Sequence, residues 1–94
     1  MPAYWIVRVN VLDADKLSAY APLAAAAVAA HGGRYLARGG QSQSVEGADY
    51  ARNVIVEWPD YATAEKAYAS AEYQKALQAL DDGADRLFVI TEGL

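Results

Sequence analysis

The pattern of apolar and polar positions predicts four strands in this chain of 94 residues. Residues 4–11 and 53–58 each have an apolar residue at every second position and a mixed set of residues between them, which is typical of strands that bury one face. The residues on the apolar faces of these two strands are Trp5, Val7, Val9, Val11, Val54, Val56 and Trp58. Two further runs, at residues 34–38 and 86–92, are long enough for strands, and we expect strands there as well.

Helical spacing of apolar residues predicts helices between these strands. Asp13, Asp60 and Ser70 each precede such a segment and are residue types that cap helix N-termini. The Gly32-Gly33 pair can end the first helix, because glycine adopts the left-handed conformation without a Cβ clash. Several tyrosines also recur at helical spacing, and we interpret them as edges of the core: Tyr20, Tyr61, Tyr68 and Tyr73.

The element order β-α-β-β-α-β predicts an α+β protein, namely a ferredoxin-like βαββαβ sandwich with a four-stranded antiparallel sheet. Right-handed crossovers place the first and third strands in the centre of that sheet. We expect one domain over residues 1–94, with the helices covering one face of the sheet. The second face is then left open.

The open face should be too apolar to remain in water and too charged to form a plain core. If Trp5 and Val54 lie under the helices, the predicted open face consists of Tyr4, Ile6, Arg8, Arg34, Leu36, Arg38, Ile55, Glu57, Phe88, Ile90 and Glu92. We therefore expect a homodimer in which two open faces pack together. Some charges would be paired in that interface, and others would line a cavity.

Four of the five arginines should gather at one end of the sheet, because the strands alternate in direction. They are Arg8, Arg38, Arg52 and Arg86. One interpretation is a site for a small anion, since guanidinium groups bind carboxylates in a fork. The other, which the sequence favours, is neutralisation by aspartates in nearby loops, namely Asp13, Asp49, Asp82 and Asp85. At the opposite end we expect Arg34 beside Glu57, with Glu92 and Tyr4 nearby.

Candidates for proton transfer are few. His31 is the only histidine and ionises near neutral pH, but its place after a helix suggests that its ring binds the terminal carbonyls. Glu57 is the other candidate. A single histidine and no cysteine leave no metal site, and no phosphate-binding loop or dinucleotide motif occurs. We expect neither metal nor cofactor, and whether the protein is an enzyme stays open.

Charge and hydropathy exclude two classes of partner. The net charge of −4 argues against nucleic-acid binding, which needs clustered basic residues. No segment approaches the roughly 20 apolar residues that span a bilayer. The N-terminus lacks the basic region of a secretory signal, so we expect a cytoplasmic protein without membrane partners.

Several segments resemble a family of small bacterial proteins called domain of unknown function 1330. The most specific is GGRYLARGG at residues 32–40, and residues 4–9, 54–59, 67–68, 70–74 and 90–93 also match. The resemblance implies the dimeric α+β barrel superfamily, in which two ferredoxin-like sheets face each other. Superfamily relatives include cofactor-free monooxygenases, muconolactone isomerase-like proteins and haem-degrading enzymes, whereas the family itself has no established activity.

Two hypotheses follow. In the first, a homodimer binds a small anionic or aromatic metabolite, with or without cofactor-free enzyme activity of a monooxygenase-like or isomerase-like kind. Its ligand-binding residues would be Arg8 and Arg38, with Arg34 and Tyr4, and His31 or Glu57 would transfer protons. In the alternative, the protein is a non-catalytic dimerisation or interaction module that binds no ligand. A dry interface with every arginine paired would favour this alternative.

Overall fold

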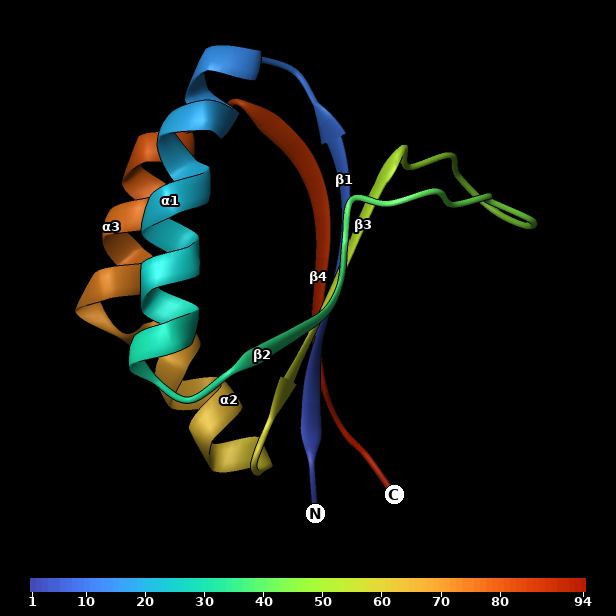
Figure 1. The fold of residues 1–94 in the computed structure, drawn as a ribbon. Helices are drawn as coiled ribbons and strands as arrows, with labels where there is room; N and C mark the ends of the chain where they lie inside the picture. The colour runs from blue at the N-terminus through green and yellow to red at the C-terminus, as the bar shows by residue number, and fades with distance from the viewer.

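The computed structural model describes all 94 residues and contains one sheet with helices on a single face (Figure 1). The elements are, in order, β1 (Ala3–Val11), α1 (Ala14–Ala30), β2 (Arg34–Arg38), β3 (Arg52–Trp58), α2 (Tyr61–Ala69), α3 (Ala71–Leu80) and β4 (Ala84–Glu92). No helix has the length and apolar character needed to cross a membrane.

The four strands form an antiparallel sheet in the order β2-β3-β1-β4. The first and third strands are therefore central, as the right-handed crossovers predict. This is the ferredoxin-like α+β arrangement, and the predicted fold class is confirmed.

The predicted helix caps are also confirmed. The Asp13 carboxylate accepts hydrogen bonds from the backbone N–H groups of Asp15 and Lys16. Asp60 and Ser70 do the same for α2 and α3. These contacts satisfy amide groups that have no partner inside the helix.

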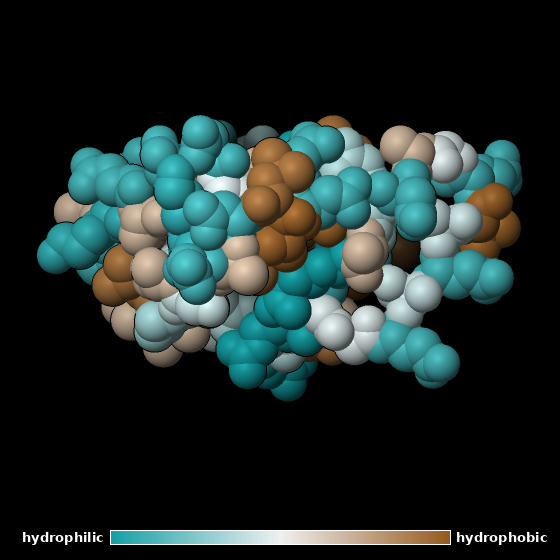
Figure 2. All heavy atoms as spheres, turned by 90° about the horizontal axis from the view of Figure 1, so that it is seen from above, coloured by the Kyte–Doolittle hydropathy of each residue, from teal (hydrophilic) through white to brown (hydrophobic).

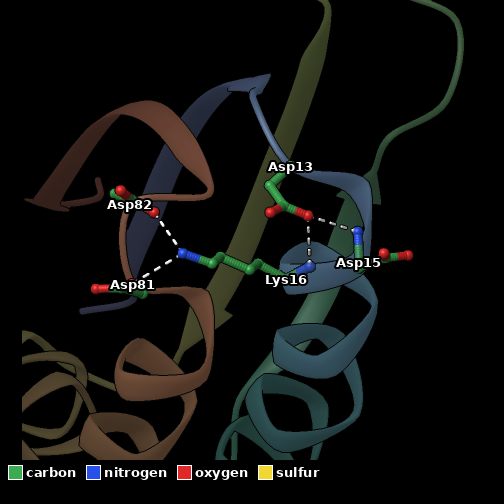
Figure 3. A network of polar contacts seen from close by, with 5 residues as sticks. All are labelled: Asp13, Asp15, Lys16, Asp81 and Asp82. Atoms are coloured by element: carbon green, nitrogen blue, oxygen red, sulfur yellow. Dashed lines mark hydrogen bonds and ion pairs between the residues drawn. The ribbon is translucent and has the colours of Figure 1, made fainter.

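Lys16 connects the start of α1 to the end of α3 (Figure 3). Its Nζ lies 2.9 Å from Asp81 Oδ2 and 2.5 Å from Asp82 Oδ1. The hydrogen bonds that Lys16 donates to Asp82 and then to Asp81 raise the pKa of Lys16 above its usual range. The contact holds together the end of the molecule where β1 leads into α1. The surface there is mostly polar, with a compact apolar patch near its middle (Figure 2).

The core lies between the sheet and the helices, with Trp5 at its centre. The indole N–H of Trp5 donates to the backbone oxygen of Ala64 at 3.0 Å. Its ring centroid lies 4.7 Å from that of Trp58, 4.9 Å from Tyr73 and 5.1 Å from Phe88. Tilted and edge-on contacts of this kind stabilise aromatic clusters.

The structure corrects the predicted orientation of β4. Phe88 pairs with Val7 and Ile90 with Trp5, so both lie under the helices instead of on the open face, and Glu92 shares that side. Leu87 and Val89 occupy the open face and are 48% and 52% exposed. Both sides of β4 are apolar, so alternation alone could not choose between them. The aromatic cluster around Trp5 accommodates Phe88.

A bulge in β2 corrects a second prediction. Arg34 pairs with Glu57 on the open face, but the register shifts between Tyr35 and Ala37, and Arg38 then pairs with Val54 on the helix-covered face. Arg34 and Arg38 are four residues apart and would share a face in a regular strand. Because the bulge adds one residue, they lie on opposite faces.

The loop between β2 and β3, residues 39–51, extends away from the sheet on the side opposite the helices (Figure 1). Arg8 attaches it to the open face. Arg8 Nε donates to Asn53 Oδ1 at 2.9 Å and Nη2 donates to Ser44 Oγ at 2.7 Å. The guanidinium also lies over the Tyr50 ring, 5.0 Å from its centroid. Arg8 thus has a structural role in positioning this loop.

Candidate functional site

A cavity of about 150 Å³ lies between α1 and the helix-covered face of the sheet. We call it the α1–sheet cavity. Thirteen of its 16 lining residues are hydrophobic, and they come from α1, α3 and all four strands. Its aromatic wall consists of Trp5, Tyr20, Tyr35, Tyr73 and Phe88. The cavity expected from the sequence was between the open faces of a dimer, whereas the α1–sheet cavity lies on the helix-covered side of the sheet within one chain.

The three polar residues of the cavity are all arginines: Arg38, Arg52 and Arg86. Arg38 ends β2, Arg52 begins β3, and Arg86 is near the start of β4. Since β2 runs opposite to β3 and β4, these positions meet at one end of the sheet. The predicted gathering of four arginines at one end of the sheet is confirmed. The fourth, Arg8, lies at the same end but on the open face.

None of the three cavity arginines has a carboxylate partner within 4.0 Å. The ion pairs of the protein join Lys16 to Asp81 and Asp82, His31 to Glu72, and Arg34 to Glu57. The predicted neutralisation of the arginine cluster by loop aspartates is therefore wrong. Asp13 caps α1 and Asp82 binds Lys16 instead.

Each cavity arginine is held by contacts other than ion pairs. The Arg38 guanidinium lies over the Tyr35 ring, 4.5 Å from its centroid. Arg52 packs closely against Gly39, whose φ is +69°. Arg86 Nη1 donates to the hydroxyl oxygens of Tyr20 and Tyr73 at 3.2 and 3.3 Å. Stacking and hydrogen bonds to phenols position the guanidinium groups but leave their charge without a counterion.

Tyr20 and Tyr73 are joined by a short hydrogen bond of 2.6 Å between their hydroxyl oxygens. Burial raises the pKa of Tyr73 far above its usual range, and this outweighs the opposing effect of Arg86. Burial also raises the pKa of Tyr35. Tyr35 and Tyr73 are therefore neutral at physiological pH, and their hydroxyl groups are available as donors.

The open face brings together three of the predicted residues. Arg34 Nη2 lies 2.8 Å from Glu57 Oε1, and the Tyr4 hydroxyl donates to Glu57 Oε2 at 3.5 Å. This grouping agrees with the sequence-based expectation. His31 is elsewhere, at the end of α1, where Nε2 is 3.3 Å from Glu72 Oε1. Neither His31 nor Glu57 lines the α1–sheet cavity.

Of the predicted ligand-binding residues, only Arg38 lines the cavity. The sequence predicted that Arg52 and Arg86 lie at the same end of the sheet as Arg38. It did not identify them as ligand-binding residues. Tyr20 and Tyr73 were interpreted as core edges because their spacing is that of an ordinary helix. Their hydroxyl contact joins α1 to α3 and has no signal in the sequence.

Solved structures share this fold. A protein of unknown function from Rhodopseudomonas palustris matches with a TM-score of 0.79 and 17% identity, over 99% of this chain and 82% of the other. SnoaB, a cofactor-independent oxygenase from Streptomyces nogalater, matches with a TM-score of 0.67 and 18% identity, over 99% and 93%. A dimeric ferredoxin-like protein of unknown function from Thermobifida fusca matches with a TM-score of 0.67 and 14% identity, over 99% and 92%. At such identities the likeness concerns the fold alone.

The sequence comparisons lead to a family without a known activity. No curated protein matches the chain significantly. The family model described as domain of unknown function (DUF1330) matches residues 2–94, nearly the whole sequence. The protein therefore belongs to the DUF1330 family.

Proposed function

We propose that the protein binds a small molecule with an anionic group and an apolar, aromatic body in the α1–sheet cavity. The observation that carries this proposal is the set of three guanidinium groups without carboxylate partners on an otherwise apolar wall. Arg52 and Arg86 are half-buried, whereas Arg38 is exposed. Leaving a charge in a partly buried, apolar site is unfavourable unless a counterion is supplied, so this argument applies most strongly to Arg52 and Arg86. A carboxylate ligand would supply it, with the geometry that guanidinium groups match best.

The chemistry available in the cavity is binding, orientation and proton donation. Its lining contains no carboxylate and no imidazole, whereas Tyr20, Tyr35 and Tyr73 provide hydroxyl groups. The fold is compatible with catalysis without a cofactor, since SnoaB is a cofactor-independent oxygenase. We therefore propose a binding site that also supports cofactor-free chemistry, in which His31 and Glu57 play no part.

We further propose that two copies associate through their open faces. Ile6, Leu36, Leu87 and Val89 on this face are all more than one third exposed. An apolar surface of this kind on a small domain is typical of an interface. The Thermobifida fusca protein of the same fold is described as dimeric. The α1–sheet cavity lies on the other face of the sheet, so it would stay accessible in such a dimer.

The first experiment combines native mass spectrometry with calorimetric titration. Protein purified gently is examined for a bound small molecule, and ligand-free protein is titrated with benzoate. We expect a dimer mass and measurable benzoate binding. The variant Arg38→Met should weaken binding at least tenfold, because it removes one of the guanidinium groups that would bind the carboxylate.

Arg34→Met is the matched control. It removes the same charge from the same strand but on the open face, so benzoate binding should be unchanged. Equal losses in both variants would refute the assignment to the α1–sheet cavity. A dimer that carries no small molecule and binds no aromatic acid would instead favour an interaction module without a ligand.

A further inference from the structure

The three cavity arginines are distributed over two poles. Val9 on β1 pairs with Arg52 on one side and with Arg86 on the other. Since neighbouring strands are about 4.8 Å apart, the Cα atoms of Arg52 and Arg86 are roughly 10 Å apart. Arg38 belongs to the first pole, because it pairs with Val54 on β3, two residues from Arg52. The apolar side chains of Val9 and Val54 lie in the cavity wall with them.

The second pole consists of Arg86, Tyr20 and Tyr73, and it offers mainly donors to a ligand. One of the two hydroxyl hydrogens lies between Tyr20 and Tyr73, and Arg86 Nη1 donates to both oxygens. Each phenol has a single hydrogen, so the second hydroxyl hydrogen has no acceptor within the protein. The remaining N–H groups of Arg86 also have no acceptor within the protein. A ligand group that accepts hydrogen bonds would therefore satisfy this pole.

The space between the two poles is about the size of one aromatic ring. A cavity of about 150 Å³ lined by apolar side chains is large enough to hold benzene in another protein, and the α1–sheet cavity has this volume. Its wall includes the rings of Trp5, Tyr35 and Phe88, which favour an aromatic ligand through offset and edge-on contacts.

We propose that the α1–sheet cavity recognises two oxygen-bearing groups at opposite ends of a single aromatic ring. The carboxylate binds Arg38 and Arg52, and a hydroxyl group across the ring binds the Tyr20–Tyr73–Arg86 pole. The substrate class is thus monocyclic hydroxy-aromatic acids. This inference rests on the proposed function and adds the ring size and the second recognition group to it.

The test compares benzoate, 4-methylbenzoate and 4-hydroxybenzoate by calorimetric titration of the full chain. The methyl and hydroxyl groups are similar in size, so their difference isolates the hydrogen bonds at the second pole. We expect 4-hydroxybenzoate to bind about tenfold more tightly than 4-methylbenzoate, as for a hydrogen bond that involves a charged group. Tyr73→Phe and Arg86→Met should abolish this preference, while Arg38→Met weakens all three acids alike.

Tyr68→Phe is the control, because Tyr68 packs beside Tyr73 with ring centroids 5.3 Å apart but does not line the cavity. The Tyr68→Phe variant should keep the full preference for 4-hydroxybenzoate over 4-methylbenzoate. Tyr20→Phe provides a second test at a less buried position if Tyr73→Phe fails to fold. Equal affinities for the methyl and hydroxyl compounds, with binding still dependent on Arg38, would overturn this inference and leave the proposed function intact. Absence of binding by all three acids would overturn both.

Discussion

Replacing Gly33 by alanine should destabilise the fold through a clash with Trp58. A Cβ atom at position 33 would lie 2.7 Å from Cη2, 2.8 Å from Cζ3 and 2.9 Å from Cζ2 of the indole. Favourable carbon contacts begin at about 3.5 Å, so the ring or the β2 backbone would have to move by roughly 0.8 Å. Trp58 is only 1% exposed and packs against Trp5 at a centroid distance of 4.7 Å, so the core opposes this movement.

Overpacking of this kind costs about 1–3 kcal/mol. The reduced freedom of alanine in the unfolded chain offsets about 0.4–1 kcal/mol of this. We therefore expect Gly33→Ala to lower the free energy of unfolding by about 1–2 kcal/mol. In a domain of this size that corresponds to a decrease in Tm of roughly 4–15 °C.

The assay is urea denaturation followed by tryptophan fluorescence and by circular dichroism. Gly40→Ala is the matched control, because a Cβ atom at position 40 would have no atom within 4 Å and the φ of Gly40 is not in the left-handed region. It should leave stability unchanged or raise it slightly. If Gly33→Ala were as stable as Gly40→Ala, the close contact between Gly33 and Trp58 would not exist in solution.

Two further predictions concern polar contacts. Lys16→Met should lower the Tm at neutral pH, because it removes the partner of Asp81 and Asp82. Lys16 lowers the pKa of Asp82 below its usual 3.8, so the stabilisation is present above pH 3.8 and is lost as the pH falls through the lower folded value. The Tm difference between the two proteins should therefore shrink in acid, and a difference independent of pH would contradict this account. Arg8→Met should release the loop over residues 39–51, because it removes the hydrogen bonds to Asn53 and Ser44. We expect faster proteolysis in the loop and an unchanged circular dichroism spectrum. Cleavage at the wild-type rate would show that Arg8 does not hold the loop.

The sequence alone was sufficient to predict the helices and strands and their order along the chain. In β1 and β3 valine or tryptophan recurs at every second position beside a mixed face, and burial of one face of a sheet gives this period-two pattern. The caps at Asp13, Asp60 and Ser70 are equally local, since each depends on a side chain and amides within three residues. Gly32, with a φ of +81°, ends the α1 region as its residue type predicts.

The candidate site was predicted only in part. Strand direction follows from topology, so the end of the sheet shared by Arg38, Arg52 and Arg86 could be inferred. The face on which each lies could not, because it depends on register. Arg8, chosen as the partner of Arg38, is on the opposite face and binds the loop.

Tertiary structure decided the remaining features, and the reason is the same for each. Phe88 and Leu87 are both apolar, so only the packing around Trp5 determines which side of β4 is buried. One extra residue in β2 turns Arg38 from the open face to the α1–sheet cavity, and a bulge is set by pairing with β3. The hydrogen bond between Tyr20 and Tyr73 joins residues 53 positions apart. Local sequence encodes periodicity and caps, whereas register and long-range contacts depend on the free energy of the whole core.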